Sequence, residues 1–595
     1  MRHSLAHIAA AAVKRLWPEA KFGVGPVVDN GFYYDIDLGE QKISEAQFGK
    51  IEKTMRRIIA EAQDFDHFTM SIDQALEWSK ENGQPYKQEL LNDLRRTGTT
   101  VAKDIESTQL GIVGEGESVV SEVSFYKNGD FVDLCRGPHV KNTSDVGAFR
   151  LLRVAGAYWR GDEKKPQMQR LYGVAFSTQE ELDQYLDQQE QAKQRDHRKL
   201  GKELDLYANS SLIGAGLPLF TPRGTVLRDK LNELAQSYRI SAGYEKVWIP
   251  HIAKLDTYKT SGHFEKFPEL LRFTSSESGD ELALKPVNCP HHTQLFASRP
   301  RSYRDLPIKY LETTTVYRDE KSGELGGLNR VRAITQDDSH VFCTEDQVEK
   351  VFTELIESAQ SMYSLLGLKL SLMLSFRDET DAYLGDRETW DRAEASLKGL
   401  AEKFNLDHGV GIGEAAIYGP KMDFMATDAL GRQHQLATVQ LDYAQPERFN
   451  LEYVGEDGAK LRPVMVHCAL LGSIERFLSI FIEHTSGWFP MWAAPEQIRI
   501  LTINDTVIDY VEEVERTLRD TILMTPVKYN EMRFTRDDRN ESLGKKIREA
   551  TAWKIPVQLI IGPKDKENRE ISVRTRQNEE KVTLDHLSKY LQQIR

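Results

Sequence analysis

The chain has 595 residues, of which 40% are hydrophobic and 28% are charged, and it carries a formal net charge of −13. This length exceeds what a single hydrophobic core supports and predicts about three to five domains. The excess of acidic residues excludes a protein that coats nucleic acid through a broad positive surface, although a local basic site remains compatible with it.

The pattern of apolar residues indicates a cytoplasmic protein with no membrane partner. No apolar run approaches the ~20 residues that cross a bilayer, and the N-terminus lacks the apolar core of a signal peptide. The four cysteines are too few for a disulfide framework, so a special role for any of them would be metal binding or chemistry. They are Cys135, Cys289, Cys343 and Cys468.

Residues 1–177 mix short helical and strand patterns and are expected to form a separate N-terminal domain. Two pairs of residues at four-residue spacing stand out, His3 with His7 and Cys135 with His139. On a helix this spacing places both members on one face, which suits the alanine-rich segment after His7. Gly137 and Pro138 instead favour a loop for the second pair. Two histidines with a cysteine and a histidine could make a tetrahedral zinc site.

Residues 178–207 contain few apolar side chains and many charges at helical spacing. This pattern is typical of a solvated connecting helix. We expect it to act as a linker between the N-terminal domain and a long middle domain over residues 208–494.

The middle domain begins with an amphipathic helix whose apolar face contains Leu227, Leu231 and Leu234. Gly243 is expected to end this helix before a strand that closes at Pro250. Further along, "MVHCALLGSIERFLSIFIEH" predicts a second apolar strand and helix in the same domain.

The segment 316–340, "VYRDEKSGELGGLNRVRAITQDDSH", predicts two strands joined by a glycine-rich loop. Arg318 and Glu320 would share one face of an extended segment, and Arg330 would return on the second strand. A cation for phosphate beside a carboxylate for an adenine amino group indicates a nucleoside triphosphate site. A surface hairpin with solvated charges is the alternative.

Residues 495–595 alternate between strand and helix patterns, as a compact α/β domain does. The extended segments include "IRILTI", "TPVKYN" and "IPVQLIIG", and helices are expected from Val511 to Leu523 and near Leu584 to Ile594. From Glu496 onward there are 19 basic and 18 acidic residues, a net charge of +1, so the rest of the chain holds −14. The last hundred residues therefore differ in net charge from the acidic remainder of the chain.

Several motifs together resemble the threonyl-tRNA synthetases, a family of class II aminoacyl-tRNA synthetases. The segment ending at Pro250, the Arg318-Asp319-Glu320 hairpin and the run from Gly472 to Arg476 match the three class II motifs. Threonine identity is carried by "NCPHH", "RVRAITQDDSH", "YGPK", "TVQLDY" and "VMVHCALLGSIERF". The resemblance covers nearly the whole chain, beginning after the small N-terminal ubiquitin-like domain that many members carry.

The resemblance implies an α+β catalytic domain with an antiparallel sheet, an N-terminal α+β editing domain and a C-terminal α/β anticodon-binding domain. It also implies a homodimer that joins L-threonine to threonine tRNA through an adenylate, with ATP and magnesium. The implied catalytic residues are Arg318, Glu320, Arg330 and Arg476, and the implied zinc ligands are Cys289, His340 and His467. The implied substrate-binding residues are Gln336, Asp338, Tyr418, Lys421, Gln435, Thr438 and Gln440.

Two further sets follow from the same resemblance. An editing site that hydrolyses mischarged seryl-tRNA without a required metal is implied at His3, His7, Lys87, Asp133, Cys135 and His139. Anticodon contacts are implied at Asn540, Arg548, Asp565 and Arg574, where Asp565 stands in place of the family's glutamate. The alternatives are a metal-dependent hydrolase built on the N-terminal His and Cys set, and a synthetase-like RNA-binding regulator without catalysis.

Overall fold

The computed structural model describes residues 1–97, 120–162, 164–267, 270–404, 407–521 and 532–594. The chain divides into two compact units, Met1–Glu190 and Gln191–Arg595. The predicted extended segment "TPVKYN" lies outside the described residues. No helix among the described residues combines the length and apolar character needed to cross a membrane.

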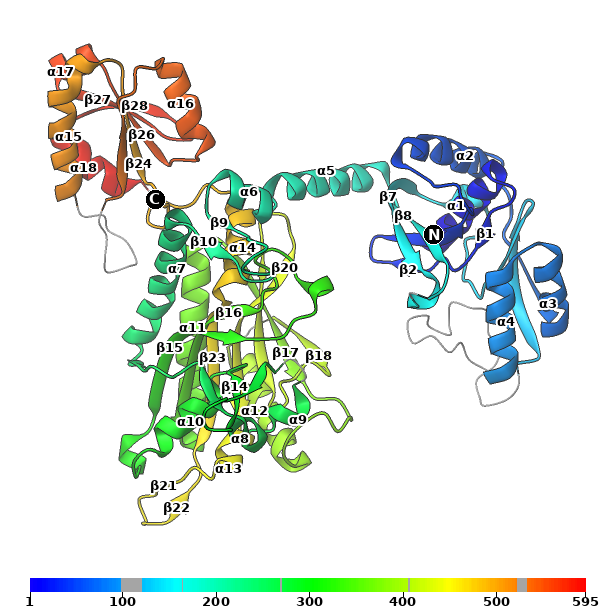
Figure 1. The fold of residues 1–595 in the computed structure, drawn as a ribbon, viewed down its shortest axis with the longest axis horizontal. Coiled ribbons are helices and arrows are strands. Elements are labelled where there is room, and N and C mark those ends of the chain that lie inside the picture. Colours follow the sequence, from blue (N-terminus) through cyan, green and yellow to red (C-terminus); the bar gives the residue numbers. More distant parts are fainter. Residues whose placement is uncertain (98–119, 163, 268–269, 405–406, 522–531, 595) are drawn as a thin grey trace. The chain divides into compact units, whose positions relative to one another are not determined.

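The first unit contains two packed layers of sheet and helix (Figure 1). In the larger layer, the strands run in the order β1-β3-β8-β7, with β2 paired to β3, against helices α1 and α2. Helix α1 is buried from Ser4 to Val13, because its alanines allow close packing on the sheet. The elements are α1 (Arg2–Leu16), β1 (Lys21–Phe22), β2 (Val27–Val28), β3 (Gly31–Asp37), α2 (Phe48–Ala60), β7 (Ala148–Tyr158) and β8 (Gln167–Phe176).

The smaller layer of this unit is a three-stranded antiparallel sheet, β4-β5-β6, packed against two helices. Its elements are β4 (Asp66–Ser71), α3 (Ile72–Glu81), α4 (Pro85–Thr97), β5 (Glu122–Asn128) and β6 (Phe131–Leu134). Cys135 and His139 follow β6 in a loop, as predicted, while His3 and His7 lie on α1.

The segment expected to form one connecting helix forms two, α5 (Gln179–Arg195) and α6 (His197–Glu203). The break falls at Asp196, whose carboxylate accepts a hydrogen bond from the Arg198 N–H and so begins a new helix. Helix α5 buries only Leu182 along its length. Helix α6 instead contributes Leu200 to the core of the second unit, so the solvated surface predicted for the whole segment is found on α5 alone.

The centre of the second unit is an eight-stranded sheet in the order β11-β15-β16-β23-β20-β19-β17-β18. Its inner pairs are antiparallel, and the two edge pairs, β11 with β15 and β17 with β18, are parallel. The strands are β11 (Glu245–Lys246), β15 (Ile308–Tyr317), β16 (Ala333–Cys343), β17 (Lys369–Phe376), β18 (His408–Ile412), β19 (Lys421–Thr427), β20 (Gln433–Asp442) and β23 (Val464–Ser473).

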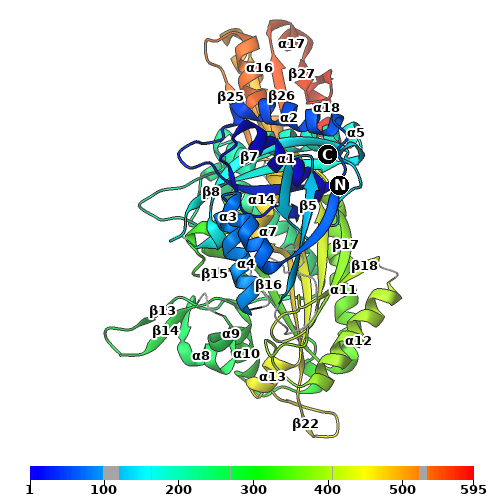
Figure 2. The same ribbon diagram turned by 90° about the vertical axis from the view of Figure 1, so that its right-hand side faces the viewer.

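Helices and small hairpins cover this sheet. Figure 2 shows α8 to α10 with β13 and β14 on one side of it and α11 and α12 on the other. The helices are α7 (Pro222–Ser241), α8 (Leu255–Thr260), α9 (His263–Lys266), α10 (Cys289–Ala297), α11 (Val348–Leu365), α12 (Arg387–Lys403), α13 (Ala444–Arg448) and α14 (Ile474–Thr485). The short strands are β9 (Tyr207–Ala208), β10 (Leu219–Phe220), β12 (Ile252–Lys254), β13 (Arg272–Thr274), β14 (Glu281–Leu284), β21 (Tyr453–Val454) and β22 (Lys460–Leu461).

The predicted apolar face of α7 is correct, since Leu227, Leu231 and Leu234 are all buried. Gly243 follows this helix with φ +83°, which suits glycine. The predicted strand after it is shorter than expected, because β11 ends at Lys246, four residues before Pro250.

The C-terminal part of the second unit is a five-stranded mixed sheet, β25-β24-β26-β27-β28, with helices around it. Its elements are β24 (Ile498–Thr502), α15 (Ile508–Asp520), β25 (Phe534–Asp537), α16 (Leu543–Ala552), β26 (Val557–Ile561), α17 (Pro563–Asn568), β27 (Glu570–Arg574), β28 (Glu579–Thr583) and α18 (Leu584–Gln593). The α/β prediction for this domain is confirmed. Helix α18 begins at the predicted Leu584 and ends one residue before Ile594, and α15 begins three residues before the predicted Val511. The predicted end of that helix at Leu523 lies outside the described residues.

Candidate active site

The predicted nucleotide hairpin exists as β15 and β16, which pair from Ile308↔Phe342 to Tyr317↔Ala333. Arg318 and Glu320 follow the end of β15. Arg330 lies in the connecting loop, three residues before β16, and not on the second strand as expected. The loop is held by its own side chains, since Arg330 Nε donates to Glu320 Oε2 over 2.7 Å. Arg332 donates to the backbone carbonyl of Glu320 over 3.0 Å.

The other two arginines that the sequence predicts for this site are Arg318 and Arg476. The Arg318 guanidinium lies over the ring of Phe267, 5.0 Å from its centroid. Arg476 is exposed in the first turn of α14, where Ser473 caps the helix by accepting from the Arg476 N–H over 3.2 Å. Gly472, with φ +69°, allows β23 to turn directly into this helix. Arg318, Arg330 and Arg476 thus lie in the β15–β16 loop and on α14, which meet at the end of the sheet.

Strand register gathers two of the predicted metal ligands and several predicted substrate residues on one face of the sheet. His340 on β16 pairs with His467 on β23, which pairs with Gln440 on β20, which pairs with Lys421 on β19. The next row contains Asp338, Ala469 and Thr438. Because register partners share a face, these side chains converge.

A pocket on this face is lined by Asn288, Cys289, Arg318, Gln336, Asp338, His340, Tyr418, Thr438, Gln440 and His467, among others. Lys421, the register partner of Gln440, and Gln435 are connected to this pocket through Asp423. Lys421 Nζ donates to Asp423 over 2.5 Å, and Gln435 Nε2 donates to the same carboxylate over 2.7 Å. Thr438 also donates to Asp423, so this buried carboxylate orders one wall of the pocket.

Cys289, His340 and His467 are buried, and their ligand atoms lie within 4.8 Å of one another. His340 Nε2 and His467 Nδ1 are 3.1 Å apart. Two nitrogens bound tetrahedrally to zinc at 2.0–2.1 Å would be about 3.3 Å apart, so the donor set fits this ion. Burial raises the pKa of the Cys289 thiol well above its usual range, and a cation would offset that effect.

The other ring nitrogen of each histidine is fixed by a residue that sequence reasoning missed. His467 Nε2 lies 2.7 Å from Asp442 Oδ2, and His340 Nδ1 lies 2.8 Å from His292 Nδ1. His292 Nε2 in turn faces Glu312 Oε2 at 3.6 Å. Partners of this kind orient metal-binding imidazoles. His292 and Asp442 lie in the motifs "NCPHH" and "TVQLDY", which gave neither of them a role, whereas Glu312 lies in no quoted motif.

The part of the pocket formed by Asp338, Tyr418 and Gln440 is polar and ordered. Asp338 Oδ2 accepts from Asn288 Nδ2 over 2.8 Å, and Tyr418 OH donates to Gln440 Oε1 over 2.6 Å. The Tyr418 ring stacks on His467 with centroids 4.7 Å apart. Burial raises the pKa of Asp338, which favours a cationic partner such as a substrate ammonium group.

The N-terminal residues also form one cluster, within the first unit. Cys135 Sγ lies 3.3 Å from both His3 Nε2 and His139 Nε2. The ligand atoms of His3, His7, Cys135 and His139 all lie within 4.8 Å of one another. The predicted i, i+4 pair on α1 therefore meets the predicted loop pair.

Asp133 completes this cluster as an anchored carboxylate. Lys87 Nζ lies 2.6 Å from Asp133 Oδ1, and the Tyr34 hydroxyl donates to Oδ2. Burial lowers the pKa of His3 to about 4 and of His139 to about 2, and it raises the pKa of Cys135 to about 12. The three groups are therefore neutral near pH 7 and available as proton donors and acceptors.

The four predicted anticodon residues are spread over the C-terminal domain. Asn540 is exposed in the loop before α16, Arg548 is exposed on α16, and Arg574 ends β27. Asp565 is buried, and its carboxylate accepts from the Gly562 N–H over 2.9 Å at the start of α17. Its visible contacts are therefore structural.

The catalytic sheet, the nucleotide hairpin and the C-terminal domain define a class II aminoacyl-tRNA synthetase. Residues 271–485 match the tRNA synthetase class II core domain (G, H, P, S and T). Residues 123–172 match the Threonyl and Alanyl tRNA synthetase second additional domain, and residues 497–594 match an anticodon binding domain.

Comparison with individual relatives shows which members of this class the chain is similar to. The chain is 45% identical over 591 residues to a threonine–tRNA ligase of Gloeobacter violaceus, covering 98% of this chain and 89% of the relative. It is 42% identical to that of Cytophaga hutchinsonii, covering 96% and 84%. A solved structure described as the RNA binding domain of threonyl-tRNA synthetase from Cryptosporidium parvum is 35% identical with a TM-score of 0.62, covering 67% of this chain and 98% of that one.

The chain belongs to the threonine–tRNA ligase family. Its class II core and its second additional domain are those of a synthetase that aminoacylates and edits. These matches favour the ligase over both alternatives, the metal-dependent hydrolase and the non-catalytic regulator.

Proposed function

We propose that the chain joins L-threonine to threonine tRNA through a threonyl-adenylate, using ATP with magnesium, and that the pocket on β16, β20 and β23 selects threonine. The observation that supports this most directly is the row of His340, His467 and Gln440 across three adjacent strands beside Cys289. Zinc bound there by one thiolate and two imidazoles would keep an open position for substrate. It would supply Lewis-acid contacts to the amino and hydroxyl groups of threonine.

The chain's own residues would surround that substrate. Asp338 and Gln336 would hold the amino group, and Tyr418 with Gln440 would close the pocket around the side chain. Valine lacks the hydroxyl and would leave a polar site unpaired, which is why such sites reject it strongly.

Arg318 lines the same pocket and would hold the α-phosphate of ATP beside the threonine carboxylate. Arg330 and Arg476 would hold the far end of the triphosphate, and Glu320 would accept from the adenine amino group. Arginine suits this work because its planar fork binds phosphate oxygens in pairs.

The N-terminal cluster would hydrolyse seryl-tRNA, because serine keeps both groups that threonine presents and lacks only a methyl. That difference discriminates by only roughly 10- to 200-fold. The C-terminal domain would bind the anticodon through Asn540, Arg548 and Arg574. A cytoplasmic location follows from the activity, since tRNA is charged where translation takes place.

A homodimer is proposed from the apolar surface around α7 and the segment after it. Trp248 is 76% exposed, and Ile240 and Ile252 are also exposed nearby in the chain. Aromatic and aliphatic side chains with this exposure are typical of an interface. A second copy of this chain would cover them.

Threonine-dependent ATP–pyrophosphate exchange tests the proposed reaction. Threonine should support exchange, serine should support it weakly, and valine and proline should not. Exchange that depends on proline or valine instead would refute the assignment of the pocket.

A further inference from the structure

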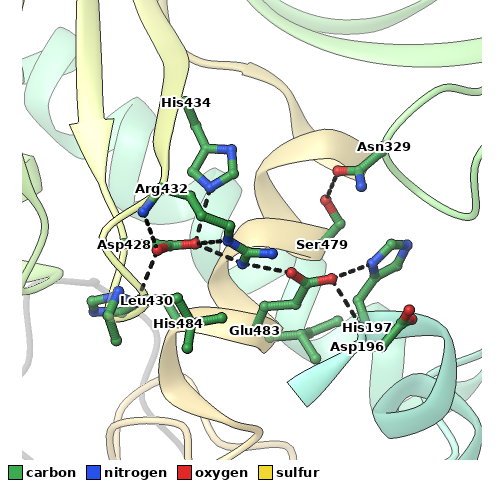
Figure 3. Close-up of polar contacts among 12 residues, drawn as sticks. Asp196, His197, Asn329, Asp428, Leu430, Arg432, His434, Ser479, Glu483 and His484 are labelled. Carbon is green, nitrogen blue, oxygen red and sulfur yellow. Dashed lines mark hydrogen bonds and ion pairs between the residues drawn. The ribbon is translucent and has the colours of Figure 1, made fainter. Parts of the chain in front are cut away.

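A buried polar network connects α6, the nucleotide loop and α14 (Figure 3). The residues labelled there are different from those that line the pocket around Cys289, His340 and His467. His197, the first residue of α6, places Nδ1 2.7 Å from Glu483 Oε1 on α14. The backbone N–H of His197 donates to the same oxygen over 3.1 Å. On its other side, His197 Nε2 lies 3.1 Å from the backbone nitrogen of Leu328 in the nucleotide loop.

These contacts define which ring nitrogen of His197 carries the proton. A backbone N–H can only donate, so His197 Nε2 must accept from Leu328. The proton of the neutral ring is therefore on Nδ1 and points to Glu483. One side chain thus joins the loop to α14, and neither ring nitrogen is left for a metal, although Asp196, His197 and Glu483 are close enough to resemble a metal site.

Glu483 is itself firmly held. Its second oxygen accepts from Arg432 Nη2 over 2.6 Å, and Arg432 Nε donates to Asp428 Oδ2 over 2.7 Å. Asp428 Oδ1 accepts from the backbone N–H groups of Leu430 and Arg432 in the β19–β20 turn. The anchor for His197 is therefore fixed to the central sheet as well as to α14 (Figure 3).

The conformation of the loop also fits the imidazole of His197. Gly327 has φ +56°, and a Cβ there would lie 2.3 Å from His197 Nε2. Leu328 is fully buried, and the Asn329 side chain accepts from the Ser479 hydroxyl on α14. Arg330 follows directly in sequence, and Arg476 lies one turn before Ser479 on α14.

We propose that His197 is a positioning residue for ATP. It holds the loop segment 326–330 against α14, so that Arg330 keeps its place relative to Arg476. This inference rests on the proposed role of Arg330 in binding the triphosphate. It gives α6 a part in the activation reaction, which neither the linker interpretation nor the class II motifs assign to it.

Two substitutions separate the two contacts of the ring. In His197→Asn, the amide nitrogen can replace Nδ1 as donor to Glu483, but the contact with Leu328 is lost. In His197→Gln, the longer side chain can place its oxygen near Nε2 and accept from Leu328, while Glu483 loses its donor. Arg330→Ala is the reference for direct loss of a phosphate contact.

ATP–pyrophosphate exchange on the full chain gives KM for ATP and for threonine separately. We expect His197→Asn to raise the KM for ATP roughly tenfold with little change in the KM for threonine, as loss of one buried hydrogen bond would. His197→Gln should keep the KM for ATP near the parent value and lower the midpoint of thermal unfolding. A purely structural role would instead move both KM values together.

Gly327→Ala provides a second test, because it adds a methyl group and removes no polar group. Its methyl group would displace the loop from His197, so the KM for ATP should rise and the KM for threonine should not. If Arg330→Ala raises the KM for ATP while His197→Asn and Gly327→Ala do not, the positioning role is wrong. If Arg330→Ala also leaves it unchanged, the proposed function of Arg330 fails first.

Discussion

Arg239 and Asp337 form an ion pair that is fully buried behind the strand carrying the substrate pocket. The pair lies where the register between β16 and β23 shifts, between Gln336 and Asp338. Asp337 Oδ2 accepts from the backbone N–H groups of Leu470 and Leu471 over 3.0 and 2.8 Å. One carboxylate thus satisfies the backbone donors that the irregular pairing leaves open and ties them to α7.

The neighbours Asp337 and Asp338 should therefore respond differently to the same substitution. Asp337→Asn leaves Arg239 as a buried charge without its counterion and should lower the free energy of unfolding by about 3 kcal/mol. Asp338→Asn should leave thermal unfolding nearly unchanged. It should lower kcat/KM for threonine by roughly 10- to 100-fold, because a charged hydrogen-bond partner is lost. Equal effects of the two variants on unfolding would contradict this division.

Zinc content should depend on Cys289. Cys289→Ser removes the thiolate and should abolish threonine activation while bound zinc falls well below one ion per chain, measured by atomic absorption. Cys343→Ser is the matched control, because Cys343 is also a buried free thiol but does not line the pocket. Unchanged zinc in the Cys289 variant would refute this ligand set.

Removal of both histidines of α1 should separate editing from charging. In the His3→Ala, His7→Ala double variant, hydrolysis of preformed seryl-tRNA should slow roughly 100-fold or more, as expected when acid–base groups are lost. Threonine charging should remain near normal, because the two sites belong to different compact units. Deacylation at the parent rate would show that the editing assignment is wrong.

Anticodon recognition should depend on Arg548, which is exposed on α16. Arg548→Ala should weaken tRNA charging and leave ATP–pyrophosphate exchange intact, since activation of the amino acid needs no anticodon. Lys564→Ala, at an exposed position in α17, is the control for a general loss of positive charge. Equal loss of charging and exchange in the Arg548 variant would indicate misfolding.

Self-association should depend on Trp248. Trp248→Glu places a charge in the proposed interface and should shift the mass measured by sedimentation from that of two chains toward one. Val410→Glu, at an exposed apolar position on the opposite edge of the sheet, should leave that mass unchanged. If the parent protein sediments as a single chain, the proposed dimer is incorrect.

Local pattern predicted much of this fold. The apolar face of α7, the pairing of β15 with β16 and the α/β alternation after residue 495 all follow from short-range periodicity. The boundary at Asp196 was missed because the charge pattern continues across it, while the cap and the burial of Leu200 depend on tertiary contacts.

The site shows the same limit. Family motifs placed Cys289, His340 and His467, whereas spacing alone could not, because 51 and 127 residues separate them along the chain. His292 on α10 and Asp442 on β20 lie in quoted motifs, but their contacts with His340 and His467 depend on the tertiary structure. Arg330 lies outside the predicted second strand because the glycine-rich loop continues to Arg332 before β16 begins.

The pairing of Arg330 has a consequence for how ATP would enter. Arg330 contacts Glu320 over 2.7 Å and Glu324 over 2.5 Å, so a triphosphate must compete with two carboxylates for one guanidinium. With the proposed roles of the two residues, binding would be an exchange of ion pairs, in which Glu320 would turn toward the adenine as Arg330 turned to phosphate. Affinity is reduced by the contacts given up, and a ligand that carries only one of the two groups, base or phosphate, would complete only half of the exchange.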